Sequence, residues 1–133
     1  MTRINLVPPS ELSREHLQGE YHEITRMFGL VREAQKRGKN KWNYGIPETF
    51  RLGSGHMKFF ADKLDFIANR YHSLAEDMRR RGYSPNEIPR ESLLEGIHSS
   101  WIGDYTPTHD AIAISRQRIK DYDRDWETVS NEV

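Results

Sequence analysis

The chain has 133 residues, enough for one domain with a substantial buried core. It contains no cysteine, which excludes disulfide bonds and thiolate metal sites. Its 20 basic and 20 acidic side chains give a net charge of zero, which argues against a strong nucleic-acid binder. No apolar run is long enough for a membrane span, and the N-terminus lacks the apolar stretch of a signal peptide. We therefore expect a cytoplasmic protein that has no membrane partner.

The charges are distributed unevenly along the chain. Residues 1–58 hold ten Lys or Arg against six Asp or Glu, a net charge of +4. Residues 59–90 carry +1, and residues 91–133 hold four basic against nine acidic side chains, a net charge of −5. A basic N-terminal half beside an acidic C-terminal part is consistent with one DNA-facing surface. A solvated surface without a partner explains the same counts equally well.

The first feature in chain order is an N-terminus that can carry a reactive amine. Thr2 follows Met1 directly, and a small second residue allows the cell to remove Met1. Removal leaves an α-amino group, whose unperturbed pKa is roughly 7.7–8.0. Part of that group is therefore unprotonated and nucleophilic at neutral pH. The alternative is a frayed N-terminus without a function.

Residues 14–38 are predicted to form the first long helix. Apolar side chains recur along this segment at spacings of three and four residues, as on a helix with one buried face. They are Leu17, Tyr21, Ile24, Phe28 and Val31. Ser13 is placed to cap the start of the helix, and Gly38 is placed to end it.

A polar patch lies beside this apolar stripe. His22 and Arg26 are four residues apart, and Glu23 and Arg26 are three apart, so the side chains are neighbours on the helix surface. A helical ion pair between Glu23 and Arg26 would explain the pattern without any chemistry. Beside a free amine, however, the patch suits imine chemistry. The amine can attack a sugar C1′, the carboxylate can remove the C2′ proton, and the cations can bind phosphates. This scheme requires no metal and no other cofactor.

Two more long helices are predicted. Residues 56–82 carry an apolar stripe over five turns, and Gly82 ends it. The glycines before residue 56 do not follow a predicted strand, so we interpret them as a turn into this helix and not as a phosphate-cradling loop. A short helix is possible over residues 90–97. The last long helix begins at Thr106 and Pro107, and it turns Ser115 inward between Ile112 and Ile119.

No stretch shows the alternation of a strand, so we predict a compact all-α fold of three main helices with long connecting loops. Residues 1–133 form a single domain, with an acidic C-terminal tail from about residue 121. The loop over residues 38–55 is long, basic and aromatic, and loops of this length often have a function. The six histidines show no zinc-binding spacing, so we predict no metal site.

Several segments together resemble a known family. MTRINL, EY-E--R-FG-VR, TF-LG-GH---FF-DKL-F and IAIS--R are similar to the pyrimidine-dimer DNA glycosylases of phages, also called endonuclease V. The similarity extends from residue 1 to about residue 120. It implies a compact all-α fold and a combined DNA glycosylase and abasic-site lyase. The substrate would be double-stranded DNA that contains damaged bases, bound by a monomer.

The resemblance also assigns residues to the site. It implies that the α-amine of Thr2 is the nucleophile and that Glu23 is the essential carboxylate. Arginines of the family clamp phosphates around the lesion, and other positions line the site. The matching DNA-binding positions are Arg3, His16, Tyr21, Arg26 and Arg118, and His22 stands at a further DNA-binding position.

The chain departs from the family at charged positions. His22 replaces a family arginine, Tyr122 replaces a cation one turn after Arg118, and Glu33 replaces a lysine. The chain ends in DYDRDWETVSNEV, where the family has an aromatic, basic segment. These departures predict fewer phosphate contacts and weaker binding to DNA than the family pattern implies.

Three alternatives to the dimer glycosylase follow from the sequence. The same chemistry could act on another damaged base or on abasic sites only. The chain could also be a DNA-binding helical module without catalysis, in which case Met1 would be retained or Thr2 acetylated. A hydrolase that uses the Thr2 hydroxyl is excluded, because such enzymes resemble layered α/β sandwiches and this chain is too short and too helical.

Overall fold

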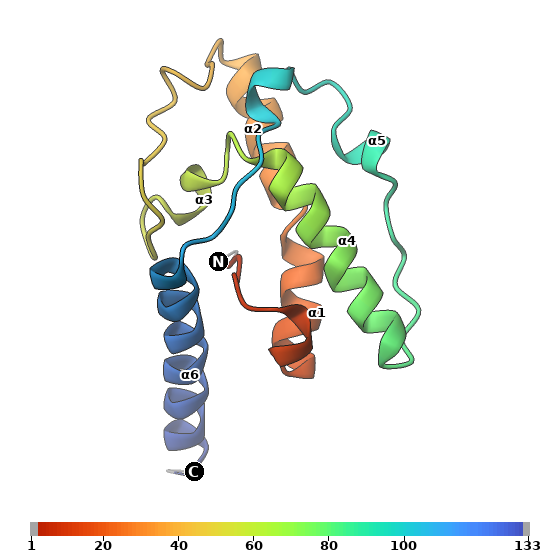
Figure 1. The fold of residues 1–133 in the computed structure, drawn as a ribbon, viewed down its shortest axis with the longest axis vertical. Helices are drawn as coiled ribbons and strands as arrows, with labels where there is room; N and C mark the ends of the chain where they lie inside the picture. Colours follow the sequence, from red (N-terminus) through yellow and green to blue (C-terminus); the bar gives the residue numbers. More distant parts are fainter. Residues whose placement is uncertain (1–2, 132–133) are drawn as a thin grey trace.

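The computed structural model describes residues 3–131, with side chains described from Arg3 to Asp123. Within that range the regular elements are all helical, which confirms the predicted all-α class (Figure 1). The longer helices are α1 (Arg14–Glu23), α2 (Arg26–Lys36), α4 (Leu64–Arg80) and α6 (His109–Asn131). The short ones are α3 (His56–Phe59), α5 (Arg90–Leu93) and the 3-10 turns Pro9–Glu11 and Ser99–Trp101.

The prediction of one helix over residues 14–38 was wrong in one respect, because the segment is divided into α1 and α2. The side chain of Ser13 accepts a hydrogen bond from the His16 N–H, as expected for the cap of α1. At the division, the N–H groups of Met27 and Phe28 donate to carbonyls three residues earlier, a tighter turn than in an α-helix. The apolar stripe continues on both sides, so its periodicity did not reveal the division.

The second predicted helix is also divided. The chain turns between α3 and α4, and Lys63 and Ile102 form an isolated antiparallel bridge there. The turn into α3 is made by glycines as predicted, because Gly55 has a φ of +89° that other residues rarely adopt. Gly82 ends α4 with a φ of +91°, again as predicted.

The start of the last helix was predicted two residues too early. The first residue of α6 is His109, and the side chain of Thr108, not that of Thr106, accepts a hydrogen bond from the Ala111 N–H at 3.0 Å. The helix α6 continues to Asn131, so the segment from about residue 121, predicted as an acidic tail, has a helical backbone. The predicted short helix near residue 90 is α5.

A close backbone approach holds the segment before α6 against the start of α4. The N–H of Gly103 donates to the Asp62 carbonyl, and the N–H of Asp65 donates to the Gly103 carbonyl, both at 3.0 Å. A Cβ atom on Gly103 would lie 2.5 Å from that Asp62 oxygen, so only glycine fits. This contact fixes where the chain enters α6.

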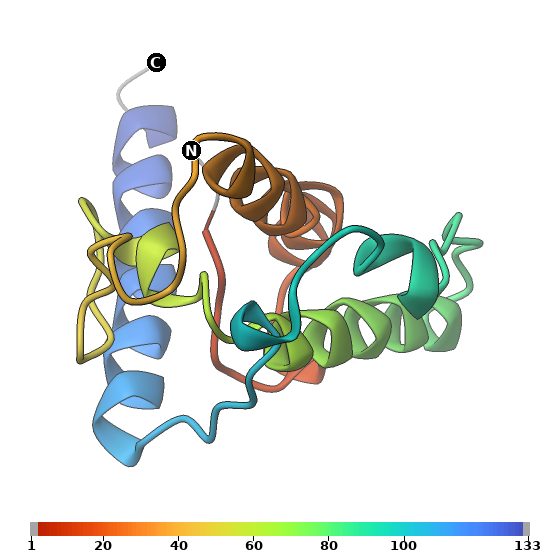
Figure 2. The same ribbon diagram turned by 90° about the horizontal axis from the view of Figure 1, so that it is seen from above.

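The N-terminal segment, residues 3–7, is extended and passes through the interior of the molecule (Figures 1 and 2). It lies between α6 on one side and α1 and α4 on the other. Ile4 is fully buried in the core, with Leu6 and Val7 also buried. The core continues into the apolar faces of α1, α2 and α4. The N-terminal segment is therefore a central part of the fold.

Candidate active site

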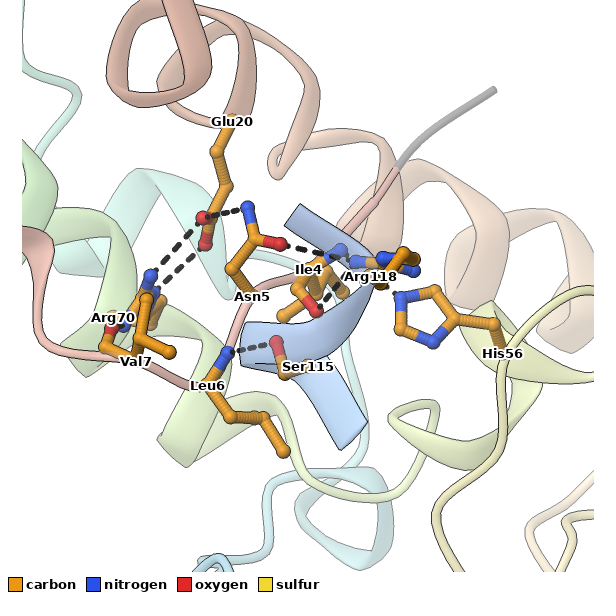
Figure 3. Close-up of polar contacts among 9 residues, drawn as sticks. All are labelled: Ile4, Asn5, Leu6, Val7, Glu20, His56, Arg70, Ser115 and Arg118. Atoms are coloured by element: carbon orange, nitrogen blue, oxygen red, sulfur yellow. Dashed lines mark hydrogen bonds and ion pairs between the residues drawn. The ribbon is translucent and has the colours of Figure 1, made fainter. Parts of the chain in front are cut away.

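Side chains from four helices hold the N-terminal segment in place (Figure 3). The N–H of Ile4 donates to Nε2 of His56 in α3 at 3.0 Å. The N–H of Leu6 donates to Oγ of Ser115 in α6 at 2.9 Å, so Ser115 does point inward as predicted. Arg70 in α4 donates to the Val7 carbonyl. These bonds satisfy backbone groups of an extended segment that pairs with no neighbouring strand.

A buried ion pair is attached to the same segment (Figure 3). Glu20 of α1 accepts from Nε of Arg70 at 2.7 Å and from a terminal nitrogen of Arg70 at 3.0 Å. Glu20 also accepts from the side-chain amide of Asn5 at 2.9 Å. Arg118 of α6 donates to the other end of that amide at 3.1 Å. The charges are fully partnered, which a buried ion pair requires.

The sequence analysis did not single out Asn5, Glu20, His56 or Arg70. A signal was available for the ion pair. Glu20 lies three residues after Leu17 and four before Ile24, so it occupies the buried face of its helix. Arg70 lies in the same relation to two apolar residues of α4. Opposite charges at core positions of two helices predict that the helices pack against each other with the charges paired.

The N-terminal segment, α1 and α6 enclose a cleft of about 320 Å³, called here the first cleft. Its lining residues are Arg3, Asn5, Glu15, His16, Gly19, Glu20, Glu23, Arg118, Ile119 and Tyr122. The cleft brings the predicted carboxylate, Glu23, together with the predicted cations Arg3 and Arg118. Burial, and then the charge of Arg3, lower the pKa of Arg118 to about 10, so its guanidinium remains charged at neutral pH.

His16 also lines the first cleft, as the resemblance implied. Its Nε2 lies 2.9 Å from a carboxylate oxygen of Asp123, and its ring meets the Tyr122 ring edge-on. The guanidinium of Arg3 lies 5.3 Å from the centre of the Tyr122 ring, a cation–π contact. Tyr122 therefore holds a cation of the N-terminal segment at this wall.

Other predicted site residues lie elsewhere. Tyr21 is in the core, where its ring stacks on Tyr71 and its hydroxyl lies 3.2 Å from the Tyr71 hydroxyl. Burial and that hydrogen bond raise the pKa of Tyr21. His22 and Arg26 are exposed near the end of α1 and are not part of the first cleft. Thr2 lies outside the described residues.

Comparison with protein families identifies the family of the chain. A family model described as pyrimidine dimer DNA glycosylase matches residues 1–89, two-thirds of the chain. The chain belongs to the pyrimidine dimer DNA glycosylase family. Family membership makes it a DNA repair glycosylase, with DNA that contains pyrimidine dimers as substrate. The match includes α1 to α4 and Glu23, but it ends before Arg118, so the likeness beyond residue 89 stays a prediction.

Two further observations concern residues 3–131. Among the described side chains, from Arg3 to Asp123, no three His, Asp or Glu converge in a way that could hold a metal ion. The helices found there are all too short or too polar to span a membrane.

Proposed function

We propose that this glycosylase acts through the α-amine of Thr2, once Met1 is removed, and that it is also an abasic-site lyase. The amine attacks C1′ of the damaged nucleotide, and the glycosidic bond breaks with its electron pair leaving on the base. The sugar ring opens and gives an imine between C1′ and the amine, as in other amine-catalysed reactions of carbonyl compounds.

Glu23 then acts as the proton acceptor of the lyase step. It removes a proton from C2′ of the imine, the C3′–O3′ bond breaks, and its electron pair leaves with the 3′ phosphate. Water hydrolyses the imine and restores the amine. Proton transfer by a positioned carboxylate typically contributes a rate factor of about 10²–10⁴.

The observation that carries this proposal is the composition of the first cleft. Arg3, which is joined covalently to Thr2, lines the same cleft as Glu23 and Arg118. The bonds from His56 and Ser115 to Ile4 and Leu6 fix the segment that leads to the amine. A nucleophile on a fixed segment loses less entropy when it reacts than one on a free chain end.

The proposed DNA-binding groups are Arg3, Arg26 and Arg118, with His16 and His22 beside them. Arg3 and Arg118 line the first cleft, where phosphates next to the damaged nucleotide would meet them. Arg26 and His22 lie outside that cleft, near the end of α1. Tyr21 would act indirectly, because its ring packs against His22 while its hydroxyl is occupied in the core.

Borohydride trapping tests the nucleophile. The purified protein, mixed with duplex that carries one abasic site or one cyclobutane dimer, should give a covalent adduct after reduction, and peptide mapping should place it at Thr2. A matched protein with one extra residue before Thr2 should lose most of the adduct, because its amine is displaced by several ångströms. An adduct at a lysine would contradict the assignment. Trapping on abasic DNA alone would favour the abasic-site alternative.

A further inference from the structure

A second cleft adjoins the first. It has a volume of about 470 Å³ and shares Arg3 and Arg118 with the first cleft as a common wall. The opposite side is formed by the segment between α2 and α3, which adds Arg51 to the lining, and by α3, which adds Lys58. Four cations therefore line the second cleft, and among the described residues no carboxylate lines it.

The fold keeps Arg51 and Lys58 available for a ligand. Both are exposed, and neither forms an ion pair with a carboxylate in the described part of the chain. Gly55 makes room for Arg51, since a Cβ there would lie 3.0 Å from Cδ of Arg51. Lys58 extends its Nζ to 5.1 Å from the centre of the Tyr44 ring. The two cations are held at the cleft by packing and not by acidic partners.

His56 forms the floor between these cations, but it adds no charge at neutral pH. Its Nε2 accepts from Ile4 and its Nδ1 donates to the Arg51 carbonyl at 2.9 Å, so both nitrogens are occupied in the neutral form. Burial, together with the charges of Arg118 and Arg3, lowers the pKa of His56 to about 4, although the hydrogen bond to the Arg51 carbonyl opposes this shift. The charge in the cleft at neutral pH is therefore that of four fixed cations.

We propose that the second cleft binds a backbone phosphate of the substrate DNA, beyond the phosphates that meet the first cleft. Four like charges without a counter-charge repel one another, and an anion that they share relieves that repulsion. The occupant is a DNA phosphate because the shared wall of Arg3 and Arg118 joins this cleft to the proposed active site. This inference rests on the proposed function, which places the damaged nucleotide at the first cleft.

The cations of the second cleft also compensate for cations that the chain lacks elsewhere. His22, Glu33 and Tyr122 stand where the family resemblance implies cations. Arg51 and Lys58 supply two cations on a different segment. The phosphate contact comes from side chains and not from a glycine-rich loop, which agrees with the glycines here being turn residues.

Equilibrium binding tests the proposal without any turnover. Duplex with a single tetrahydrofuran, an abasic analogue without the C1′ hydroxyl, is titrated at several salt concentrations with the parent protein and with Arg51→Gln, Lys58→Gln and the double variant. The log–log salt slope should become shallower by about 0.9 for each lost phosphate contact. Arg80→Gln, which removes an exposed cation at the far end of α4, is the matched control and should leave the slope unchanged.

Neutral methylphosphonate linkages then locate the phosphate. Each linkage near the tetrahydrofuran is neutralised in turn, and at least one should weaken binding of the parent but not of the double variant. A salt slope that is the same in the double variant as in the parent would overturn the proposal. The proposal would also fail if each neutral linkage weakened binding of the double variant as much as binding of the parent. Borohydride trapping is scored separately. If the imine is trapped but the variants keep the parent's salt slope, only the role of the second cleft is rejected. If the variants have a shallower slope but no imine is trapped, only the amine chemistry is rejected.

Discussion

The two clefts share one wall and differ in almost everything else. Arg3 and Arg118 line both. The first cleft adds glutamates, among them Glu23, whereas the second adds Arg51 and Lys58 and no described carboxylate. Carboxylates beside cations can move protons near bound phosphates, but cations alone can only bind an anion. We therefore propose chemistry for the first cleft and phosphate binding for the second.

The N-terminal segment explains why the clefts lie together. Its residues run between α6 and the α1–α4 pair, so Arg3 is presented to both sides (Figure 2). Asn5 joins Arg118 to Glu20 behind that wall. The net charge of zero conceals this arrangement, because acidic residues elsewhere balance a locally basic surface.

The largest expected effect is on catalysis in the first cleft. Glu23→Gln keeps the shape of the side chain and removes its charge, so strand cleavage should fall by about 10²–10⁴-fold. Binding to tetrahydrofuran duplex and its salt slope should be retained. Single-turnover cleavage of abasic duplex measures the first effect. Glu15→Gln, in the same cleft, is the matched control, and cleavage by Glu23→Gln at the parent rate would reduce Glu23 to a surface ion-pairing residue.

A second test concerns Glu20, which lines the first cleft together with Glu23. Glu20 is paired with Arg70 and buried, so it should contribute to stability and not to proton transfer. Arg70→Met leaves the Glu20 carboxylate without its partner and should cost about 3–5 kcal/mol in the free energy of unfolding. Urea unfolding measures this cost. The double variant Glu20→Leu/Arg70→Met should lose less than the single one, and equal losses would show that the pair is not coupled.

A third test concerns His56 at the floor of the second cleft. Its pKa of about 4 lies below the ordinary value of 6.5, so between these values the unfolded chain binds a proton that the folded chain does not. Stability linked to His56 is therefore complete above about pH 6.5 and falls by up to about 3 kcal/mol as the pH drops toward 4.

The variant His56→Gln isolates that contribution. Its amide oxygen can accept from the Ile4 N–H but does not titrate. In urea unfolding between pH 7 and 4.5, the parent should lose stability faster than the variant, so the two curves should converge at low pH. If the stabilities of the parent and the variant instead fall in parallel as the pH drops, His56 takes up a proton in the folded protein without a loss of stability.

The smallest expected effect lies outside both clefts. His22 is exposed at the end of α1, where the family resemblance implies an arginine. His22→Arg places a permanent positive charge there, so in the Glu23→Gln background it should tighten binding to dimer-containing duplex by about twofold to fivefold, as expected for an exposed charge contact. Equilibrium titration of the two proteins measures the difference. An unchanged affinity would show that position 22 does not meet a phosphate.

Much of the fold could be predicted from the sequence, because its signals are local. Apolar spacing of three and four residues located the helical segments, Ser13 was the cap of α1, and Gly82 ended α4. Short sequence motifs such as MTRINL also indicated the family that the family model confirms. The breaks between α1 and α2 and between α3 and α4 were missed, because apolar residues on both sides face the same core. A helical stripe reports which face is buried and not whether the axis is continuous.

The sequence by itself determined the helical class and the family. The combination of an N-terminal amine with Glu23 stays a prediction from the sequence. Only the tertiary structure decided which charged groups meet. The Ile4–His56 bond spans 52 residues and the Leu6–Ser115 bond spans 109, so no local pattern contains them. Arg51 was an ordinary residue of a basic loop, and Lys58 an ordinary residue of a predicted helix, until the fold placed them opposite Arg3 and Arg118. Electrostatic interaction depends on distance in space, and sequence spacing fixes that distance only within one helix.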